Sequence, residues 1–292
     1  MIKQYLKLMR ISHWIKNFFV FVPLVFSKHL TDFNYGQKVI FAFLIFSLVS
    51  SFVYVINDLM DVEVDRHHPK KKDRPIASGK ISPLKAKILA IGLLAVVGIL
   101  LPFANTAFTV AVIAYLIINF LYSVKLKRIV IVDLMCLASG FMLRVLGGAY
   151  IINVAVSNWL ILTTLFLSIF LAIMKRKSEL ENVSNHSETR KVLQDYPNAF
   201  VDQISAVSAT GVLLCYSLYS VSERTVQYFK TEYLVYTTIF VVFGVFRYMY
   251  LVYKQHKGEN TIEIVVKDIP MLINSVLYGI SLLVIIYLAK MI

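Results

Sequence analysis

The chain alternates between long apolar runs and short charged stretches, and this pattern predicts nine membrane-crossing helices. At about 1.5 Å per residue, such runs can cross about 30 Å of hydrocarbon as helix. Backbone groups in lipid must bond within their own segment, and no run alternates as a membrane strand would, so helices are expected throughout. The expected spans are residues 14–31, 39–57, 87–104, 106–123, 131–151, 157–174, 199–221, 233–253 and 270–290.

Composition agrees with this pattern and limits the number of domains. The 292 residues are 58% hydrophobic and 16% charged, whereas about a quarter of a soluble domain is charged. The apolar excess falls in the runs, which leaves no room for a large domain outside the membrane. We therefore expect an all-α, polytopic membrane bundle with a single domain over residues 1–292.

The basic residues indicate how the bundle is oriented. Most of the 30 Lys and Arg residues lie before the first span or in the connections after the second, fourth, sixth and eighth spans. Basic residues accumulate on the cytoplasmic side of membrane proteins. We expect a bacterial inner-membrane protein with a cytoplasmic N-terminus and an outer C-terminus. This distribution accounts for the net charge of +13 without a nucleic-acid partner.

An acidic motif follows the second span, and it is the sharpest chemical feature of the sequence. It contains Asn57, Asp58, Asp61 and Asp65. On a continuous helix, residues 57, 61 and 65 share one face, with residue 58 beside them. Oxygen ligands of this kind suit Mg²⁺, which commonly bridges carboxylates to substrate phosphates. The motif predicts a magnesium-diphosphate site in which the three aspartates are catalytic; the alternative is a solvated helix end.

Two groups of basic residues are candidate phosphate ligands. Arg74 lies in the same connection as the acids, beside a proline and a Ser-Gly turn. After the sixth span, Lys175 and Glu179 are spaced i, i+4, and Arg176 and Glu179 are spaced i, i+3, so all three can share a helical face. The composition of this second group is net positive and suits phosphate; the alternative is a helix end flanked by orientation charges.

Two arginines, Arg144 and Arg247, lie within predicted spans. A charge at membrane depth is costly and usually faces the bundle interior with a partner. Each arginine is therefore either a substrate contact or a buried structural ion. Asp133 lies three turns before Arg144 on the same helical face, and Lys16 near the N-terminus either anchors the interface or binds phosphate.

These motifs together resemble the UbiA-type intramembrane prenyltransferase superfamily. The resemblance rests on Asn57-Asp58-x-x-Asp61-x-x-x-Asp65 with Arg74-Pro75-Ile76-Ala77-Ser78-Gly79, and it extends over essentially the whole chain. It implies nine transmembrane helices around a cytoplasm-facing cavity. One departure is informative: typical members carry a second DxxxD motif after the sixth span, where this chain has Lys175-Arg176-Lys177-Ser178-Glu179-Leu180. That substitution is similar to the decaprenyl-phosphate phosphoribosyltransferase branch.

The resemblance implies Mg²⁺-dependent transfer of 5-phosphoribose from phosphoribosyl diphosphate to a polyprenyl phosphate, with release of diphosphate. It assigns the metal and diphosphate to the acidic motif. The implied substrate-binding residues are Lys16, Asn57, Arg74, Lys127, Arg144, Lys175, Arg176, Glu179 and Arg247. Two alternatives stay open: prenyl transfer to an aromatic or alcohol acceptor, and a membrane transporter without chemistry. The oligomeric state is left open as well.

Overall fold

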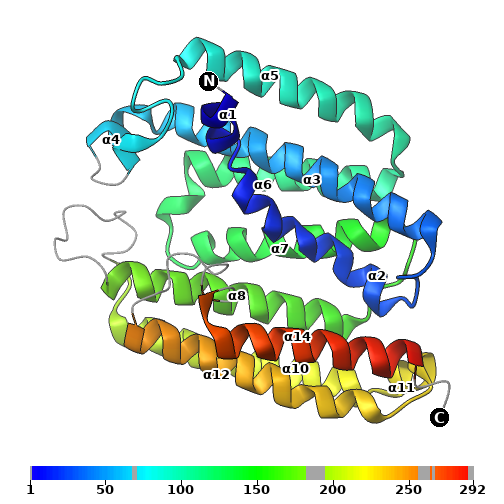
Figure 1. Ribbon diagram of the computed structural model, residues 1–292. Coiled ribbons are helices and arrows are strands. Elements are labelled where there is room, and N and C mark those ends of the chain that lie inside the picture. The colour runs from blue at the N-terminus through cyan, green and yellow to red at the C-terminus, as the bar shows by residue number, and fades with distance from the viewer. Residues whose placement is uncertain (1, 68–70, 182–194, 256–263, 265–266, 289–292) are drawn as a thin grey trace. The chain divides into compact units, whose positions relative to one another are not determined.

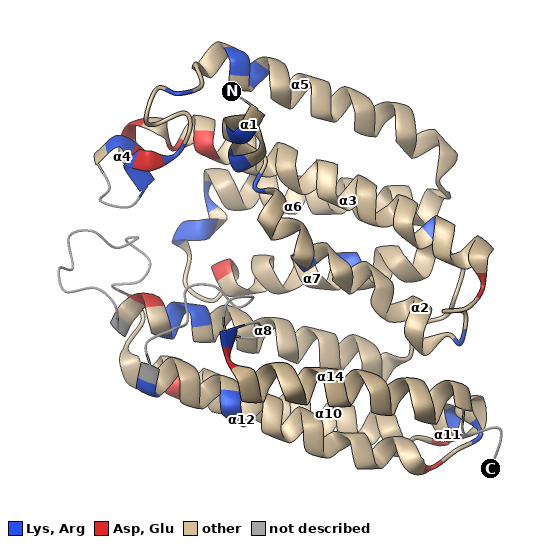
Figure 2. Ribbon diagram, viewed as in Figure 1, with Lys and Arg blue, Asp and Glu red and all other residues tan. Residues whose placement is uncertain are grey.

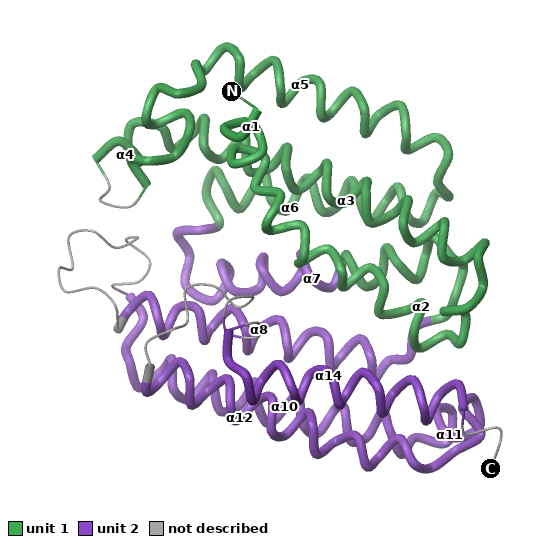
Figure 3. The backbone as a smooth tube through the Cα atoms, viewed as in Figure 1, with its two compact units in different colours: residues 1–126, 143–155 green, residues 127–142, 156–292 purple. Residues whose placement is uncertain are grey.

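The computed structural model describes all residues except 1, 68–70, 182–194, 256–263, 265–266 and 289–292. Every regular element in this part of the chain is a helix, which confirms the all-α prediction (Figure 1). The chain divides into two compact units (Figure 3). Unit 1 comprises residues 1–126 and 143–155, and unit 2 comprises residues 127–142 and 156–292.

Eight helices in the described part of the chain are long and apolar enough to cross a membrane. They lie within a few residues of eight of the nine predicted spans. The predicted first span, 14–31, corresponds instead to a shorter apolar helix, Ile11–Phe26. The protein is therefore a multi-pass membrane protein, and the count of nine stays a prediction.

Unit 1 is built around the long helix α3. Its elements are α1 (Ile2–Leu8), the 3₁₀ helix η1 (Ile11–Phe21), α2 (Val22–Phe26), α3 (Phe33–Met60), α4 (Val62–His67), η2 (Lys71–Asp73), α5 (Pro83–Leu100), η3 (Leu101–Phe103), α6 (Thr106–Val124) and the second half of α7 (Val132–Ile151). α3 packs against α5, α6 and η1. Fully buried side chains such as Phe46 and Phe108 meet edge to face in its core.

Two glycines in α7 allow the backbones of unit 1 to approach closely. A Cβ atom on Gly148 would lie 2.0 Å from the main-chain oxygen of Val20 in η1. A Cβ atom on Gly147 would lie 2.6 Å from the Phe46 ring. Small residues commonly serve this purpose where membrane helices pack. The glycine pair therefore fixes how α7 packs against η1 and α3.

Unit 2 contains the first half of α7 and the C-terminal helices. Its elements after α7 are α8 (Asn158–Glu181), α10 (Asn198–Val221), α11 (Glu223–Phe229), η6 (Tyr233–Thr237), α12 (Thr238–Gln255), α14 (Ile269–Leu283) and η7 (Val284–Leu288). α10 packs against α8 and α12, and α12 packs against α14. Within each unit, charged residues gather near the helix ends, and the middle parts of the helices are almost entirely uncharged (Figure 2).

Candidate functional site

The acidic motif lies in unit 1, where α3 ends and α4 begins. The expected unbroken helix is interrupted at Asp61, which caps α3 with φ −96° and ψ 7°. The main-chain N–H of Asp65 still donates to the oxygen of Asp61 at 2.8 Å, so the chain continues as a turn into α4. Asp58 and Asp65 are each only 2% exposed, and Asn57 and Asp61 are half-buried. The four oxygen-bearing side chains therefore belong to one compact end of unit 1.

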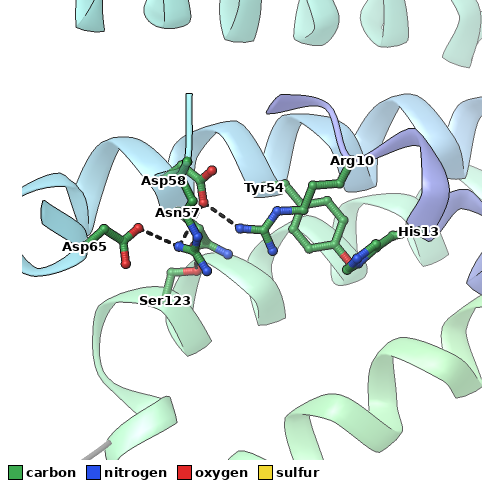
Figure 4. A network of polar contacts seen from close by, with 8 residues as sticks. Arg10, His13, Tyr54, Asn57, Asp58, Asp65 and Ser123 are labelled. Atoms are coloured by element: carbon green, nitrogen blue, oxygen red, sulfur yellow. Dashed lines mark hydrogen bonds and ion pairs between the residues drawn. The ribbon is translucent and has the colours of Figure 1, made fainter. Parts of the chain in front are cut away.

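Two arginines from other segments pair with these buried carboxylates. Nη2 of Arg10 lies 2.6 Å from Oδ1 of Asp58, and Nη1 of Arg74 lies 3.1 Å from the same oxygen. Nη1 of Arg74 also lies 2.5 Å from Oδ2 of Asp65. Figure 4 shows Arg10 reaching Asp58 from the N-terminal segment and Asp65 on the other side of the group. Two buried carboxylates and two partly buried guanidinium groups thus form a charge-balanced set.

Each of the two carboxylates keeps one oxygen that no arginine occupies. Among the described residues, neither Oδ2 of Asp58 nor Oδ1 of Asp65 has a hydrogen-bond partner. Asn57 Oδ1 contacts the hydroxyl of Ser123 at the end of α6, and that hydroxyl also lies 2.7 Å from the main-chain oxygen of Asn119. A hydroxyl has one hydrogen, so Ser123 can donate to only one of these acceptors at a time. The Asn57 oxygen is therefore also available to a further ligand.

This donor set fits the chemistry of Mg²⁺, which takes oxygen ligands. In the described part of the chain, no three His, Cys, Asp or Glu side chains converge on one point as a ready metal cage. Mg²⁺ usually binds through one or two carboxylates together with substrate phosphates and water, so such a cage is not required. Asp58, Asp65, Asn57 and the half-buried Asp61 are the residues that would hold the ion.

The connection that carries Arg74 is held in place by its own turn. The main-chain oxygen of Arg74 accepts hydrogen bonds from the N–H of Ser78 at 2.9 Å and from its hydroxyl at 2.8 Å. Gly79 follows with φ +74°, a conformation that favours glycine. Ile76 is fully buried between these points. The Arg74–Gly79 segment therefore acts as an anchored loop that directs the guanidinium toward Asp58 and Asp65.

Arg10 is a residue of the candidate site that the sequence does not single out, because before the first span it reads only as an orientation charge. Its backbone is left-handed, with φ 50° and ψ 51°, between α1 and η1. Its guanidinium stacks over the Tyr54 ring at 4.6 Å, and Tyr54 meets His13 edge to face. No sequence signal links Arg10 to Asp58, 48 residues away. Tyr54 precedes Asp58 by one helical turn and could have been assigned to the same face.

Arg144 lies in a buried polar network inside unit 1. Its Nε donates to Asn17 Oδ1 at 2.6 Å, and its Nη2 donates to the Tyr115 hydroxyl at 2.8 Å. Lys16 is half-buried within electrostatic reach of Arg144 and Arg10. Within the described residues, Lys16 has no hydrogen-bond or ion-pair partner. The structure thus gathers three cations on this side of unit 1, and among the described residues Lys16 has no counterion.

The second predicted group lies in unit 2, at the end of α8. Arg176 is 1% exposed and donates through Nε to Oδ2 of Asp133 at 3.0 Å. Its Nη1 reaches Oε2 of Glu179 at 2.5 Å, and Nζ of Lys175 lies 3.8 Å from Oε1 of the same glutamate. The i, i+3 and i, i+4 spacings therefore do bring these side chains onto one face. Because Arg176 is fully buried, it orients Glu179, whereas Lys175 and Glu179 are partly exposed.

Distant acids balance the basic run after the sixth span. Lys177 pairs with Asp202 of α10 at 2.9 Å, and the Tyr253 hydroxyl donates to the same carboxylate at 2.7 Å. Lys175, Arg176 and Lys177 thus each contact an acid in unit 2. The sequence alone indicated a net positive group, because it could not show which acids the fold would bring to it.

Tyr196 completes the buried network around Asp133. Its hydroxyl donates to Oδ1 of Asp133 at 2.6 Å and accepts from the main-chain N–H of Ile131 at 2.8 Å. Burial raises the pKa of Tyr196 above the usual range, and the hydrogen bond to Asp133 raises that pKa further. Ile131 has φ +69°, which is strained for a β-branched residue. Tyr196 therefore ties the strained start of α7 to the carboxylate that holds Arg176.

Two further predicted residues, Arg247 and Lys127, lie in unit 2. Arg247 of α12 makes two hydrogen bonds to Asp268, at 3.0 and 2.8 Å. Asp268 also caps α14 by accepting from the N–H of Met271 at 3.0 Å. This ion pair gives Arg247 the structural partner that its place in a span requires. Lys127 lies half-buried in the short helix η4 (Leu126–Arg128).

Comparison with known proteins identifies the family. Residues 18–276 match the UbiA prenyltransferase family. The chain belongs to this family. The decaprenyl-phosphate phosphoribosyltransferase of Mycolicibacterium smegmatis is 35% identical over 226 residues, which cover 75% of this chain and 70% of that protein. The decaprenyl-phosphate phosphoribosyltransferase of Mycobacterium tuberculosis (strain CDC 1551 / Oshkosh) is 33% identical over 221 residues, which cover 73% of this chain and 72% of that protein.

A solved structure shows the same fold for this UbiA-family chain. A UbiA homologue from Archaeoglobus fulgidus bound to GPP and Mg²⁺ superimposes with a TM-score of 0.72. It is 19% identical in sequence, and the match covers 97% of this chain and 99% of the homologue. The resemblance stated from the motifs is confirmed at the level of family and fold. Since the UbiA prenyltransferase family is a family of enzymes, the prediction of an enzyme is confirmed as well.

Proposed function

We propose that the protein transfers 5-phosphoribose from phosphoribosyl diphosphate to a polyprenyl phosphate and releases diphosphate. The observation that carries this proposal is the charged segment Lys175–Glu179, which stands where a second aspartate motif would hold a prenyl diphosphate. A donor with phosphates at both ends, and an acceptor that is itself a phosphate, favour basic side chains at that place. The names of the Mycolicibacterium and Mycobacterium relatives support the same donor.

The diphosphate of the donor is assigned to the acidic motif of unit 1. Asn57, Asp58, Asp61 and Asp65 would hold Mg²⁺, and Arg74 would bind phosphate oxygens from its anchored loop. Bound Mg²⁺ would neutralise the negative charge that develops on the departing diphosphate. The Mg²⁺ in the Archaeoglobus homologue supports the use of this metal. The open oxygens of Asp58 and Asp65 are the atoms best placed to accept it.

The reaction exchanges one bond at the anomeric carbon of the ribose. The bond from that carbon to the diphosphate oxygen breaks, and a bond to an oxygen of the acceptor phosphate forms. Diphosphate leaves with the electron pair of the broken bond. The acceptor phosphate is already ionised near neutral pH, so no side chain has to remove a proton. The residues bind and orient charged groups, and electrostatic positioning supplies most of the catalysis.

The other anionic groups are assigned to the remaining cations. Lys16, Lys127, Arg144, Lys175 and Arg247 are the proposed phosphate contacts, and Lys16 is the strongest candidate in unit 1 because it lacks a counterion among the described residues. Arg176 was assigned to phosphate from sequence; its burial instead favours a role in positioning Glu179. Glu179 would accept a hydrogen bond from a ribose hydroxyl.

The distribution of basic residues supports an orientation in the bacterial inner membrane. The N-terminus and the acidic motif would lie on the cytoplasmic side, where Mg²⁺ and a soluble donor are available, and the C-terminus would lie outside. Cysteine labelling from each side of intact cells tests this orientation. Labelling of a cysteine placed at exposed Asp73 only from outside would reverse it.

The second candidate function is prenyl transfer to an aromatic or alcohol acceptor. The family name and the GPP-bound homologue favour it. The purified protein should be given labelled phosphoribosyl diphosphate, polyprenyl phosphate and Mg²⁺. The proposal expects label in the lipid phase and diphosphate in solution. Absence of lipid-linked label, together with turnover of a prenyl diphosphate, would select the second candidate.

A further inference from the structure

The salt bridge between Arg10 and Asp58 occupies a carboxylate that the proposed function assigns to the metal. Asp58 is buried, and its Oδ1 accepts from both Arg10 and Arg74. We propose that Arg10 binds Asp58 only while the metal is absent, and that it transfers to the donor's diphosphate when the metal binds. Arg10 is then a second diphosphate-binding arginine beside Arg74. The identity of the donor rests on the proposed function, whereas the exchange itself does not.

The exchange follows from the charges around Asp58. A divalent cation on this carboxylate would lie within a few ångströms of the Arg10 and Arg74 guanidinium groups. At that distance like charges repel one another strongly in a protein-like dielectric. A carboxylate that ligates a metal through Oδ2 also becomes a weaker hydrogen-bond acceptor at Oδ1. Arg10 and the metal therefore compete for Asp58.

Arg10 is the arginine that the competition releases. Arg74 is held by two carboxylates, because it also pairs with Asp65 at 2.5 Å. Within the described residues, Asp58 is the sole acid that pairs with Arg10. A released guanidinium at a partly buried position requires a new anion, and the diphosphate that arrives with the metal supplies one. The flat fork of arginine suits two phosphate oxygens at once.

The surroundings of Arg10 keep it close to the site after its release. Its guanidinium stacks on Tyr54, one helical turn before Asp58 (Figure 4). The Arg10 side chain is 22% exposed. Stacking on the ring holds the side chain without fixing its hydrogen bonds to one acceptor. The left-handed backbone at Arg10 sets the direction of the side chain, at a cost that the surrounding structure must offset. A strained arginine beside a ligand site favours a functional role.

The test compares R10Q with the wild-type protein in two binding measurements. Manganese binding without any phosphate ligand is followed by electron paramagnetic resonance, with Mn²⁺ as the probe. R10Q removes the competitor and should bind Mn²⁺ several-fold more tightly. Inorganic diphosphate binding in saturating Mg²⁺ is followed by calorimetry, and R10Q should weaken it about tenfold or more because a charge-assisted hydrogen bond is lost. The two affinities should thus change in opposite directions.

The control is R66Q. Arg66 pairs with Glu63 on the exposed side of α4, and its loss should change neither affinity. If R10Q does not fold, R10K replaces it. A lysine keeps the positive charge but loses the paired N–H donors of arginine. Mn²⁺ binding should then still become tighter and diphosphate binding weaker, each by a smaller factor. Weaker binding of both ligands, or no change in either, would overturn the proposal. A protein that uses a prenyl diphosphate instead would still show the opposite changes, so failure of the proposed function is distinguishable.

Discussion

Individual charged residues in this protein are stabilised by partners far away in the sequence. Asp58 pairs with Arg10, and Asp133 pairs with Arg176, at 2.6 and 3.0 Å. Both carboxylates are buried, and removing one partner of such a pair typically costs about 3–5 kcal/mol. The sequence shows the residue types and their local spacing. It does not show that Arg10 pairs with Asp58 or Arg176 with Asp133, because only the fold brings these segments together.

At Asp58, substitution should lower the turnover of the folded protein, in addition to any loss of stability from the two ion pairs. Asp58→Asn keeps the shape of the side chain and removes the charge that would bind the metal. We expect transferase turnover to fall by at least about 100-fold, because electrostatic stabilisation of the leaving group is lost. Turnover in detergent at saturating Mg²⁺ measures this effect.

The matched control for that experiment is Asp73→Asn. Asp73 is exposed in the same connection, and within the described part of the chain only its main-chain oxygen is bonded, to Lys7. The Asp73→Asn protein should keep wild-type turnover. Full turnover by a folded Asp58→Asn protein would show that the assignment of the metal site is wrong.

Tyr196 offers a test of the network in unit 2. Tyr196→Phe removes the hydroxyl that donates to Oδ1 of buried Asp133 and accepts from the N–H of Ile131. The loss of these two hydrogen bonds should lower the free energy of unfolding by about 1–3 kcal/mol. Because the pKa of Tyr196 is raised, its neutral form is retained throughout the ordinary range. The loss should therefore be the same at about pH 6 and about pH 9, below the usual tyrosine pKa.

Thermal unfolding of the detergent-solubilised protein measures the effect at Tyr196. Tyr236→Phe is the control, since Tyr236 is 71% exposed, and it should change stability by no more than about 0.5 kcal/mol. Equal stability of the Tyr196→Phe and Tyr236→Phe proteins would contradict the role given to the Tyr196 hydroxyl.

At the scale of elements, the close approach of α7 to η1 depends on a glycine. Gly148→Ala would place a methyl group 2.0 Å from the Val20 carbonyl oxygen. Because backbone cannot move aside as a side chain can, we expect a loss of about 1–3 kcal/mol or more in the free energy of unfolding. Gly92→Ala in α5 meets open space and should be neutral or stabilising by up to about 1 kcal/mol. Thermal unfolding in detergent that ranks the two variants in the reverse order would refute this packing.

The positions of most helices could be predicted because apolar runs of span length have only one stable form in lipid. The expected span 131–151 is observed as Val132–Ile151, and 199–221 as Asn198–Val221. Two elements could not be predicted. The first apolar run forms a 3₁₀ helix, η1, that continues into a short α2, and α3 breaks at Asp61. The break in α3 lies beside the ion pair of Arg74 with Asp65, a tertiary contact that local periodicity does not contain.

At the scale of the whole molecule, the family and the class of chemistry follow from the motifs and the comparisons. The acidic motif falls in unit 1, and the Lys175–Glu179 segment falls in unit 2. From the sequence it was clear that one group is acidic and the other basic. The structure adds that both are charge-balanced by arginines or acids from other segments. We therefore expect substrate binding to exchange ion pairs at the acidic motif.

The choice of donor is the central claim, and one measurement tests it directly. The purified protein is offered phosphoribosyl diphosphate and a prenyl diphosphate together, each with its own label, with polyprenyl phosphate, an aromatic acceptor and Mg²⁺. The account predicts that the phosphoribosyl label becomes linked to the polyprenyl phosphate while no prenyl label is transferred to the aromatic acceptor, and that Asp58→Asn abolishes the phosphoribosyl transfer. Transfer of the prenyl label to the aromatic acceptor, with no phosphoribosyl label in lipid, would contradict it.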